Sequence, residues 1–161
     1  MDMGLKGRVA IVGASSRGLG KACALELARQ GATVVTCARN CEALQATAKE
    51  IRQATGAEVR HLQADLTQPE QIRHLADETL RQYGRIDVLV TNNGGPPAGH
   101  FDDFDDDDFA AAHELTLMSA VRLIRAVLPA MRVQQWGRIV NITSVSVKQP
   151  IDNLLLSNVY R

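Results

Sequence analysis

The chain has 161 residues, of which 45% are hydrophobic and 22% charged, and its 18 basic and 18 acidic side chains leave a formal net charge of zero. This length suits one domain with its own core, and a neutral balance does not indicate nucleic acid or an anionic membrane surface as a partner. No apolar run approaches the ~20 residues of a membrane span. Residues Met1–Lys6 lack the apolar core of a signal peptide. Three cysteines cannot all pair, so we expect reduced thiols and a cytoplasmic protein.

The first element is a short apolar run that leads into a glycine-rich turn. Arg8–Val12 has strand character, Gly13–Gly20 forms the turn, and a helix is expected from about Gly18 to Gln30, ended by Gly31. A strand, a glycine-rich turn and a helix make a phosphate site, because the turn allows close approach and the helix N-terminus offers free N–H groups. Such a turn can also be only a tight connection.

The remaining elements repeat the same alternation. Four more segments of strand length follow: Ala32–Cys37, Glu58–Gln63, Asp87–Thr91 and Arg138–Asn141. Three helical patterns lie between them: one capped by Asn40 and ended by Gly56, one opened by a Thr67–Glu70 capping box and ended by Gly84, and a long one from about Asp105 to Arg132. Buried strands joined by helices predict an α/β domain over residues 1–161, a doubly wound parallel sheet of about five strands with helices on both faces.

An acidic stretch, Phe101–Phe109, carries six carboxylates within nine residues. Such a run could hold a divalent metal, but acidic residues also favour the start of a helix, with the phenylalanines packed beneath. The four histidines show no paired metal spacing, so we expect no metal site. His100, in the loop Asn92–Phe104, is either a substrate contact or a solvated loop residue.

The cofactor is suggested by the end of the second strand. A dinucleotide fold that prefers NAD usually has an acid there for the ribose hydroxyls, whereas this chain has Arg39. Arg17 lies inside the glycine turn. Two guanidinium groups suit a 2′-phosphate, so we predict NADP(H) in preference to NAD(H). The alternative is that both arginines are merely solvated.

Several motifs occur in a fixed order along the chain. The glycine turn fits T-G-x-x-x-G-x-G at Gly18 and Gly20, with Gly13 and Ala14 at the threonine and first glycine. Three further motifs follow. Thr91–Gly94 is similar to an N-N-A-G motif, and two later segments, Ala126–Met131 and Gly137–Ile142, are typical of the fourth helix and the fifth strand of one enzyme family. From Gly7 to about Ser157 the sequence therefore resembles the short-chain dehydrogenase/reductase family, particularly its 3-oxoacyl-[acyl-carrier-protein] reductase-like branch.

The resemblance implies a nicotinamide cofactor and a set of residues that contact it. In this family an aspartate after the third strand, here Asp65, contacts the adenine ring. The implied cofactor-binding residues are Gly13, Ser15, Ser16, Arg17, Gly18, Leu19, Gly20, Arg39, Asp65, Leu66, Asn92 and Gly94.

The resemblance also implies hydride transfer between the nicotinamide and a carbonyl or hydroxyl group of a small substrate, such as a 3-oxoacyl thioester. The family's catalytic Asn, Ser, Tyr and Lys positions fall on Thr116, Ser144, Ser157 and Arg161. Only the serine is kept, and an aliphatic hydroxyl is a far weaker acid than a phenol. Tyr160 is an alternative proton donor: if this segment is helical, it shares a helix face with Ser157 and lies about 4.5 Å further along the axis.

Family members are longer than this chain, and their later part completes the sheet and covers the substrate. We therefore expect exposed apolar surface on the fifth strand and the long helix, and at Leu154, Leu155 and Leu156. The family's fourth and fifth helices commonly build a dimer, so homo-oligomerisation is expected once the later part is supplied. The alternative function is a truncated, non-catalytic nucleotide-binding or interaction protein.

Overall fold

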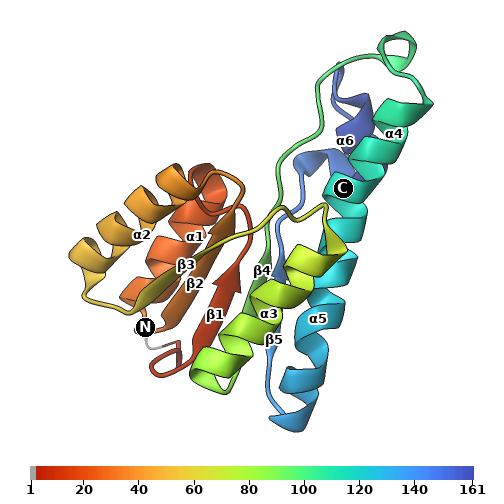
Figure 1. Ribbon diagram of the computed structural model, residues 1–161. Helices are drawn as coiled ribbons and strands as arrows, with labels where there is room; N and C mark the ends of the chain where they lie inside the picture. The colour runs from red at the N-terminus through yellow and green to blue at the C-terminus, as the bar shows by residue number, and fades with distance from the viewer. Residues whose placement is uncertain (1–2) are drawn as a thin grey trace.

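The computed structural model describes residues 3–161 and shows one parallel sheet with helices on both faces (Figure 1). The strands are β1 (Val9–Val12), β2 (Thr33–Ala38), β3 (Val59–Gln63), β4 (Val88–Thr91) and β5 (Arg138–Asn141). Their order is β3-β2-β1-β4-β5, and every neighbouring pair is parallel. The predicted doubly wound α/β fold is confirmed. The expectation about a signal peptide rests partly on Met1 and Asp2, which lie outside the described residues.

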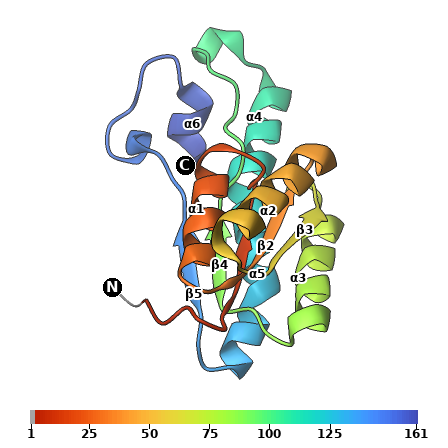
Figure 2. The same ribbon diagram turned by 90° about the vertical axis from the view of Figure 1, so that its left-hand side faces the viewer.

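The helices divide between the two faces of the sheet. They are α1 (Gly18–Arg29), α2 (Cys41–Thr55), α3 (Pro69–Tyr83), α4 (Asp106–Ala112), α5 (Ser119–Val133) and α6 (Leu155–Tyr160). Helices α1 and α2 pack on one face and α3 and α5 on the other (Figures 1 and 2). The alternation of a strand produces this division: Ile11 faces the α3–α5 core, whereas Ala10 and Val12 face the α1–α2 core.

The strand order sets where a ligand crevice is expected, at the carboxyl ends of β1 and β4. β1 and β4 are neighbours, and the chain continues from β1 to β2 and β3 on one side and from β4 to β5 on the other. In open parallel sheets ligands bind outside the carboxyl ends of the strands at such a switch point. Helices α4 and α6 rise on this same side of the sheet (Figure 1). The candidate site is therefore expected where β1, β4 and β5 end.

The helix ends follow local capping chemistry, with one correction. The Asn40 side chain accepts from the Ala43 N–H at 2.9 Å, and Gly56 and Gly84 end α2 and α3 with φ of +70°. The Thr67–Glu70 capping box is wrong, because α3 begins at Pro69, which has no N–H to satisfy and suits the first helical position. Two carboxylates of the acidic stretch do cap a helix: Asp105 and Asp108 bond each other's backbone N–H at the start of α4.

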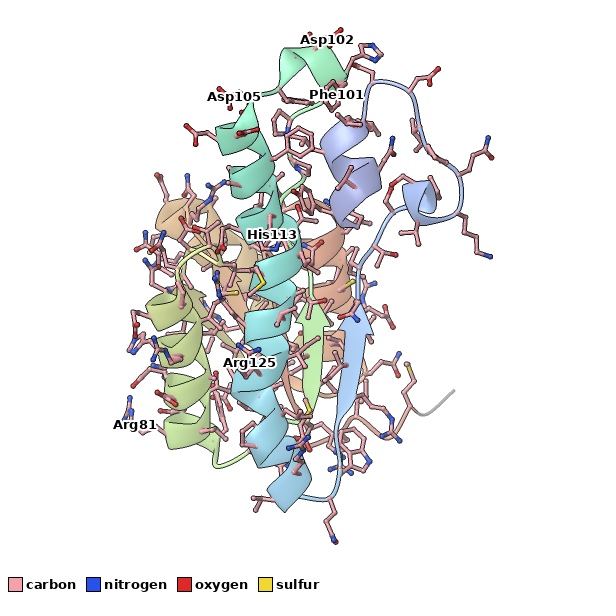
Figure 3. The ribbon with its side chains drawn as sticks, turned by 90° about the vertical axis from the view of Figure 1, so that its right-hand side faces the viewer. Arg81, Phe101, Asp102, Asp105, His113 and Arg125 are labelled. Carbon is pink, nitrogen blue, oxygen red and sulfur yellow. The ribbon has the colours of Figure 1, made fainter. Side chains whose placement is uncertain are left out.

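The long helix predicted from about Asp105 to Arg132 is continuous but irregular (Figure 3). Between α4 and α5 the residues His113–Met118 form a π-helical segment. A widened turn of this kind leaves carbonyl groups free for other donors and is frequent at functional sites. No helix among the described residues is long and apolar enough to cross a membrane.

A buried carboxylate, Asp87, links the amino ends of β1 and β4, at the end of the sheet opposite the crevice. The Asp87 side chain is 0% exposed and accepts from Arg8 at 3.0 Å, from Arg85 at 2.6 and 2.7 Å, and from the Val9 N–H at 2.9 Å. Burial by itself raises the pKa of this carboxyl, but the hydrogen bonds from Arg85, Val9 and Arg8 outweigh it and hold the pKa below its ordinary value. Arg8 also lies over the Trp136 ring, 3.9 Å from its centroid.

Exposed apolar surface occurs on β5, where Val140 is 48% exposed, as expected. The expectation for Leu154–Leu156 is wrong: Leu156 is 0% exposed, and the other two are half-buried. The reason is that α6 packs against α4 (Figure 3) and that Gly99 bridges to Leu154, with the Leu155 N–H donating to the Gly99 carbonyl at 3.2 Å. The segment after β5 is therefore folded back over the end of the long helix.

Candidate functional site

The glycine turn closes tightly on the end of β4. A Cβ built on Gly13 would lie 2.4 Å from the Asn92 carbonyl oxygen, and one on Gly20 would lie 2.5 Å from the Ala14 carbonyl oxygen. The Asn92 side-chain amide donates to the carbonyls of Gly13 and Ala14 at 3.1 and 3.2 Å. Leu66 is buried beside Gly13. These glycines are required by close packing, and Asn92 holds the turn by its side chain.

The middle of the turn is fixed by buried hydrogen bonds. Ser15 is fully buried: its hydroxyl donates to the Val12 carbonyl at 2.8 Å and accepts from the Cys37 N–H at 3.0 Å. The Ser16 carbonyl accepts from the Thr47 hydroxyl at 2.8 Å. The Ser15 side chain therefore shapes the site and does not face a ligand.

Cys37 lies beneath this turn and is excluded as a nucleophile. The side chain is fully buried, and its thiol contacts the Val12 carbonyl oxygen at 3.6 Å. Burial raises the pKa of this thiol to about 12, against a smaller lowering by a backbone hydrogen bond from Ala14. A protonated, inaccessible thiol has no reactivity at neutral pH.

The start of α1 is open to solvent and suited to an anion. Arg17, Gly18 and Leu19 are exposed, and Gly18 has φ of +57° with nothing within 4 Å of a built Cβ. The first turn of α1 contains no acidic residue and Arg17 makes no side-chain cap. The free N–H groups and the positive end of the helix dipole are thus available to a phosphate.

The ends of β2 and β3 supply the next two predicted residues. Arg39 follows β2, is exposed, and has its carbonyl bonded by the Gln63 side chain at 2.8 Å. The Asp65 carboxylate accepts from the Thr67 N–H at 2.9 Å and from the Thr67 hydroxyl at 2.8 Å. Since each carboxylate oxygen has further lone pairs, Asp65 can still accept from a bound group.

Asn93 links the end of β4 to the π-helical segment. Its side-chain amide donates to the carbonyls of Leu115 and Thr116 at 2.8 and 2.9 Å and also contacts the Ser119 hydroxyl. These bonds satisfy carbonyls that the π turn leaves free. Asn93 was not among the predicted site residues; it occupies the third position of the N-N-A-G-like motif Thr91–Gly94, where an amide in place of the family's alanine is the signal that could have revealed it.

The same helical segment is tied to the cofactor side of the sheet. Arg122 of α5 pairs with Glu114, and its guanidinium reaches the Thr67 carbonyl at 3.5 Å. The hydrogen bond from Arg122 lowers the pKa of the Glu114 carboxyl, so this pair is ionised at neutral pH. The loop that carries Asp65 and the segment that carries Thr116 are thereby connected.

A cavity of about 160 Å³ lies between the ends of β4 and β5, the π-helical segment and α6. Two predicted residues, Thr116 and Arg161, line it together with Tyr160, whereas Ser144 and Ser157 do not. The rest of the lining is Thr91, Asn93, Leu117, Ala120, Asn141, Ile142 and Thr143.

Two polar atoms at this cavity have no partner among the described residues 3–161: the Thr116 hydroxyl oxygen and the Arg161 Nε. Arg161 also donates through Nη2 to the Gly94 carbonyl at 3.4 Å. A buried polar atom without a protein partner usually binds water or a ligand atom. The cavity is therefore prepared for a polar group.

The remaining predicted catalytic residues lie nearby. Ser144 precedes a short 3-10 turn, and its hydroxyl oxygen accepts from the Ser146 N–H at 3.1 Å, which leaves its own O–H free to donate. Ser157 is buried within α6. His100 is exposed, and its backbone N–H donates to the Asp103 carboxylate at 2.7 Å. Residues 3–161 contain no group of three or more His, Cys, Asp or Glu side chains placed to hold a metal.

A doubly wound sheet with a tight glycine turn and an open helix N-terminus at its switch point defines a dinucleotide-binding domain. The family model for short chain dehydrogenases matches residues 8–156. The chain therefore belongs to the short-chain dehydrogenase family.

Curated relatives and solved structures agree with this assignment. An uncharacterised oxidoreductase of Mycobacterium tuberculosis (strain H37Rv) is 34% identical over 149 residues, which cover 89% of this chain and 43% of the relative. The 7alpha-hydroxysteroid dehydrogenase of Escherichia coli (strain K12) is 32% identical over 153 residues, covering 95% of this chain and 59% of that protein. This chain spans about half the length of these relatives.

Among solved structures, L-sorbose reductase from Gluconobacter frateurii, complexed with NADPH and L-sorbose, matches with a TM-score of 0.95 and 32% identity, over 99% of this chain and 61% of that one. An NAD⁺-bound xylitol dehydrogenase matches with a TM-score of 0.90 and 30% identity, over 96% and 59% of the two chains. Similar structures thus include complexes with both nicotinamide cofactors.

Proposed function

We propose that this chain binds NADP(H) and belongs to an oxidoreductase that transfers hydride between the nicotinamide and a carbonyl or hydroxyl group of a small substrate. The observation that carries the proposal is the open N-terminus of α1, which follows the exposed Arg17, together with a second exposed arginine, Arg39, directly after β2. Guanidinium groups pair well with phosphate, and a carboxylate in the place of Arg39 would repel it.

The residues present fit the cofactor. The α1 N–H groups and Gly18 offer an open place for the pyrophosphate, Arg17 and Arg39 suit the 2′-phosphate, and Asp65, which the resemblance assigns to the adenine ring, can still accept a hydrogen bond. When bound, the cofactor supplies the hydride donor or acceptor. Arg161 lines the neighbouring cavity and donates to the Gly94 carbonyl, and its guanidinium can hold ribose or phosphate oxygens.

The protein's part in the reaction is to hold and polarise the substrate oxygen. The unpartnered Thr116 hydroxyl can donate to that oxygen inside the cavity, and Ser144, whose O–H is free to donate but which does not line the cavity, is the contact that the resemblance implies. Ser157 and Arg161 stand at the positions where the family has tyrosine and lysine. A 3-oxoacyl thioester is the substrate that the resemblance suggests first.

A second candidate is a nucleotide-binding or interaction protein without turnover. The observation that favours it is the loss of the Tyr-x-x-x-Lys pair, since neither Ser157 nor Arg161 is a good proton carrier at neutral pH. Cofactor binding is common to both candidates, and turnover separates them.

The test combines binding with turnover. NADPH and NADH are titrated by cofactor fluorescence into the wild-type chain and into Arg17→Ala, Arg39→Ala and Arg29→Ala, the last being an exposed arginine at the far end of α1. We expect tighter binding of NADPH and a loss of that preference in the first two variants only. NADPH oxidation is then followed with an acetoacetyl thioester, L-sorbose and a 7-oxo bile acid. Binding without turnover favours the second candidate, and no binding refutes both.

The family assignment also leads us to propose self-association of this chain once the family's later part is supplied. The family's fourth and fifth helices, which correspond here to the continuous helix α4–α5 and to α6, commonly build the dimer. Sedimentation velocity of the extended protein at increasing concentration measures self-association directly, and a monomer at all concentrations contradicts the proposal.

A further inference from the structure

Of the described side chains that line the cavity beside Thr116, only Tyr160 carries a phenol, which is a stronger acid than an aliphatic hydroxyl. The other lining groups are hydroxyls, amides, apolar side chains and the Arg161 guanidinium, which stays charged. The serine that stands at the family's tyrosine position, Ser157, is buried in α6 and does not line the cavity.

The Tyr160 ring is held by two aromatic contacts. It meets Phe109 edge-on with ring centroids 6.5 Å apart and His113 with centroids 5.7 Å apart. Phe109 lies on α4 and His113 begins the π-helical segment, so both contacts come from the long irregular helix (Figure 3). Edge-to-face pairs of this kind stabilise one ring orientation. Packing against Phe109 and His113 therefore positions the Tyr160 ring, and this positioning does not depend on the Tyr160 hydroxyl.

The Thr116 hydroxyl marks where a substrate oxygen fits. Thr116 is 8% exposed, its Oγ1 has no partner among residues 3–161, and it lines the same cavity as Tyr160. A carbonyl oxygen in the cavity can accept from both hydroxyls, which satisfies the unpartnered group and polarises the carbonyl.

We propose that Tyr160 is the catalytic acid and base of this site, an assignment that rests on the proposed oxidoreductase function. In the reductive direction the carbonyl carbon gains the hydride, the carbonyl π bond opens, and the oxygen takes the Tyr160 proton. The products are an alcohol and a phenolate, which regains a proton from water. In the oxidative direction the same phenolate accepts the hydroxyl proton while the hydride leaves the carbon.

The distance along α6 between Tyr160 and Ser157, the family's tyrosine position, decides where the substrate oxygen can lie. Tyr160 is three residues beyond Ser157, which is about 4.5 Å along a helix axis. A substrate oxygen held at Ser157 is too far from Tyr160, because reacting groups tolerate errors of only about 1 Å. The substrate oxygen therefore lies in the cavity between Tyr160 and Thr116.

The decisive comparison uses three single variants: Tyr160→Phe, Ser157→Ala and Tyr83→Phe. Tyr83 is a matched control because it hydrogen-bonds Glu58 at the far edge of the sheet. Tyr160→Phe keeps the ring contacts and removes only the hydroxyl. With the fastest ketone of the panel above, we expect Tyr160→Phe to lower kcat at least ~100-fold with KM and NADPH affinity little changed, and the control Tyr83→Phe to keep kcat within about threefold. Ser157→Ala tests the competing assignment, and we expect it to lower kcat far less than Tyr160→Phe.

Other outcomes are equally clear. Wild-type kcat in Tyr160→Phe overturns the assignment of Tyr160 but leaves the proposed function standing. A loss confined to Ser157→Ala assigns the proton to the serine and also overturns it. Absence of NADPH oxidation in the wild-type chain refutes the proposed function and the assignment together.

A second readout does not depend on turnover. The chain has two tyrosines, so 3-fluorotyrosine labelling gives two ¹⁹F NMR signals, assigned with Tyr83→Phe and Tyr160→Phe. NADP⁺ plus a ketone forms a complex that cannot react. On adding NADP⁺ and the same ketone, we expect the Tyr160 signal to shift and the Tyr83 signal to stay; an unmoved Tyr160 signal at saturating NADP⁺ and ketone overturns the proposal.

Discussion

Gly20 offers the sharpest test of how the glycine turn is built. In Gly20→Ala the new Cβ would lie 2.5 Å from the Ala14 carbonyl oxygen, 2.7 Å from the Asn92 amide nitrogen and 2.9 Å from the Gly13 carbonyl oxygen. Ordinary contacts begin near 3.4 Å, so the start of α1 must move by roughly 1 Å. Overpacking costs about 1–3 kcal/mol, and the two hydrogen bonds of Asn92 weaken by about 1 kcal/mol together.

We therefore expect Gly20→Ala to lower the free energy of unfolding by about 3 kcal/mol and to weaken NADPH binding at least ~10-fold, because the N–H groups of α1 move away from the phosphate. Urea unfolding and an NADPH fluorescence titration measure the two effects. Gly56→Ala is the control: Gly56 has φ of +70° and open space, so it costs only about 1–2 kcal/mol and leaves binding intact. A Gly20→Ala protein as stable as Gly56→Ala, with wild-type affinity, refutes this account of the turn.

Two further predictions concern the ionisable side chains of Asp87, before β4, and of Tyr83, which bonds Glu58 before β3. Asp87→Asn removes the charged partner of Arg8 and Arg85 and should lower the free energy of unfolding by about 2–3 kcal/mol at pH 7. The pKa of Asp87 in the folded state lies below its unfolded value of about 3.9, so this difference from the wild type is full above pH ~3.9 and vanishes as the pH falls through the folded-state pKa. Urea unfolding at several pH values measures the difference, and a difference that does not change with pH contradicts the prediction. Burial, helped by Glu58, raises the pKa of Tyr83 to about 12, so its contribution to stability is full below pH ~10 and disappears as the pH rises toward 12; Tyr83→Phe should flatten this decline, and an identical decline in both proteins rules the assignment out.

Much of the fold was predictable because its signals are local. Strands of apolar residues ended by turns, and helices capped by Asn40 or ended by Gly56 and Gly84, are encoded within a few neighbouring residues. The start of α3 was misplaced because Thr67 bonds the Asp65 carboxylate instead of capping the helix. Two reasonable local partners competed, and the sequence alone did not rank them.

The cofactor side of the site was predictable as a location but not in its details. The glycine turn predicted a phosphate site, but the Ser15 side chain is buried and hydrogen-bonds Val12 of β1 and Cys37 of β2. Which side chains face a ligand depends on how the turn packs against β4, and Asn92 contacts it from about 80 residues away. Contacts of that separation leave no local periodic signal.

The catalytic side was the least predictable part. Motif spacing placed Ser157 at the family's tyrosine position, but the packing of α6 against α4 brings Tyr160 to the cavity with Thr116. The π-helical segment and its bonds from Asn93 arise from the meeting of two distant elements. The sequence left Ser157 and Tyr160 as alternative proton donors, and only the three-dimensional arrangement shows which of them lines the cavity.

The most direct test of the central claim is the relative affinity for the two nicotinamide cofactors, measured by fluorescence titration of the wild-type chain and of Arg39→Ala. Pairing of a guanidinium with a phosphate contributes about 1.5–3 kcal/mol, which corresponds to roughly a 10- to 100-fold preference. We predict that NADPH binds tighter than NADH by this factor and that Arg39→Ala removes most of the difference. Equal affinities, or tighter binding of NADH by the wild-type chain, would contradict the assignment of this crevice to NADP(H).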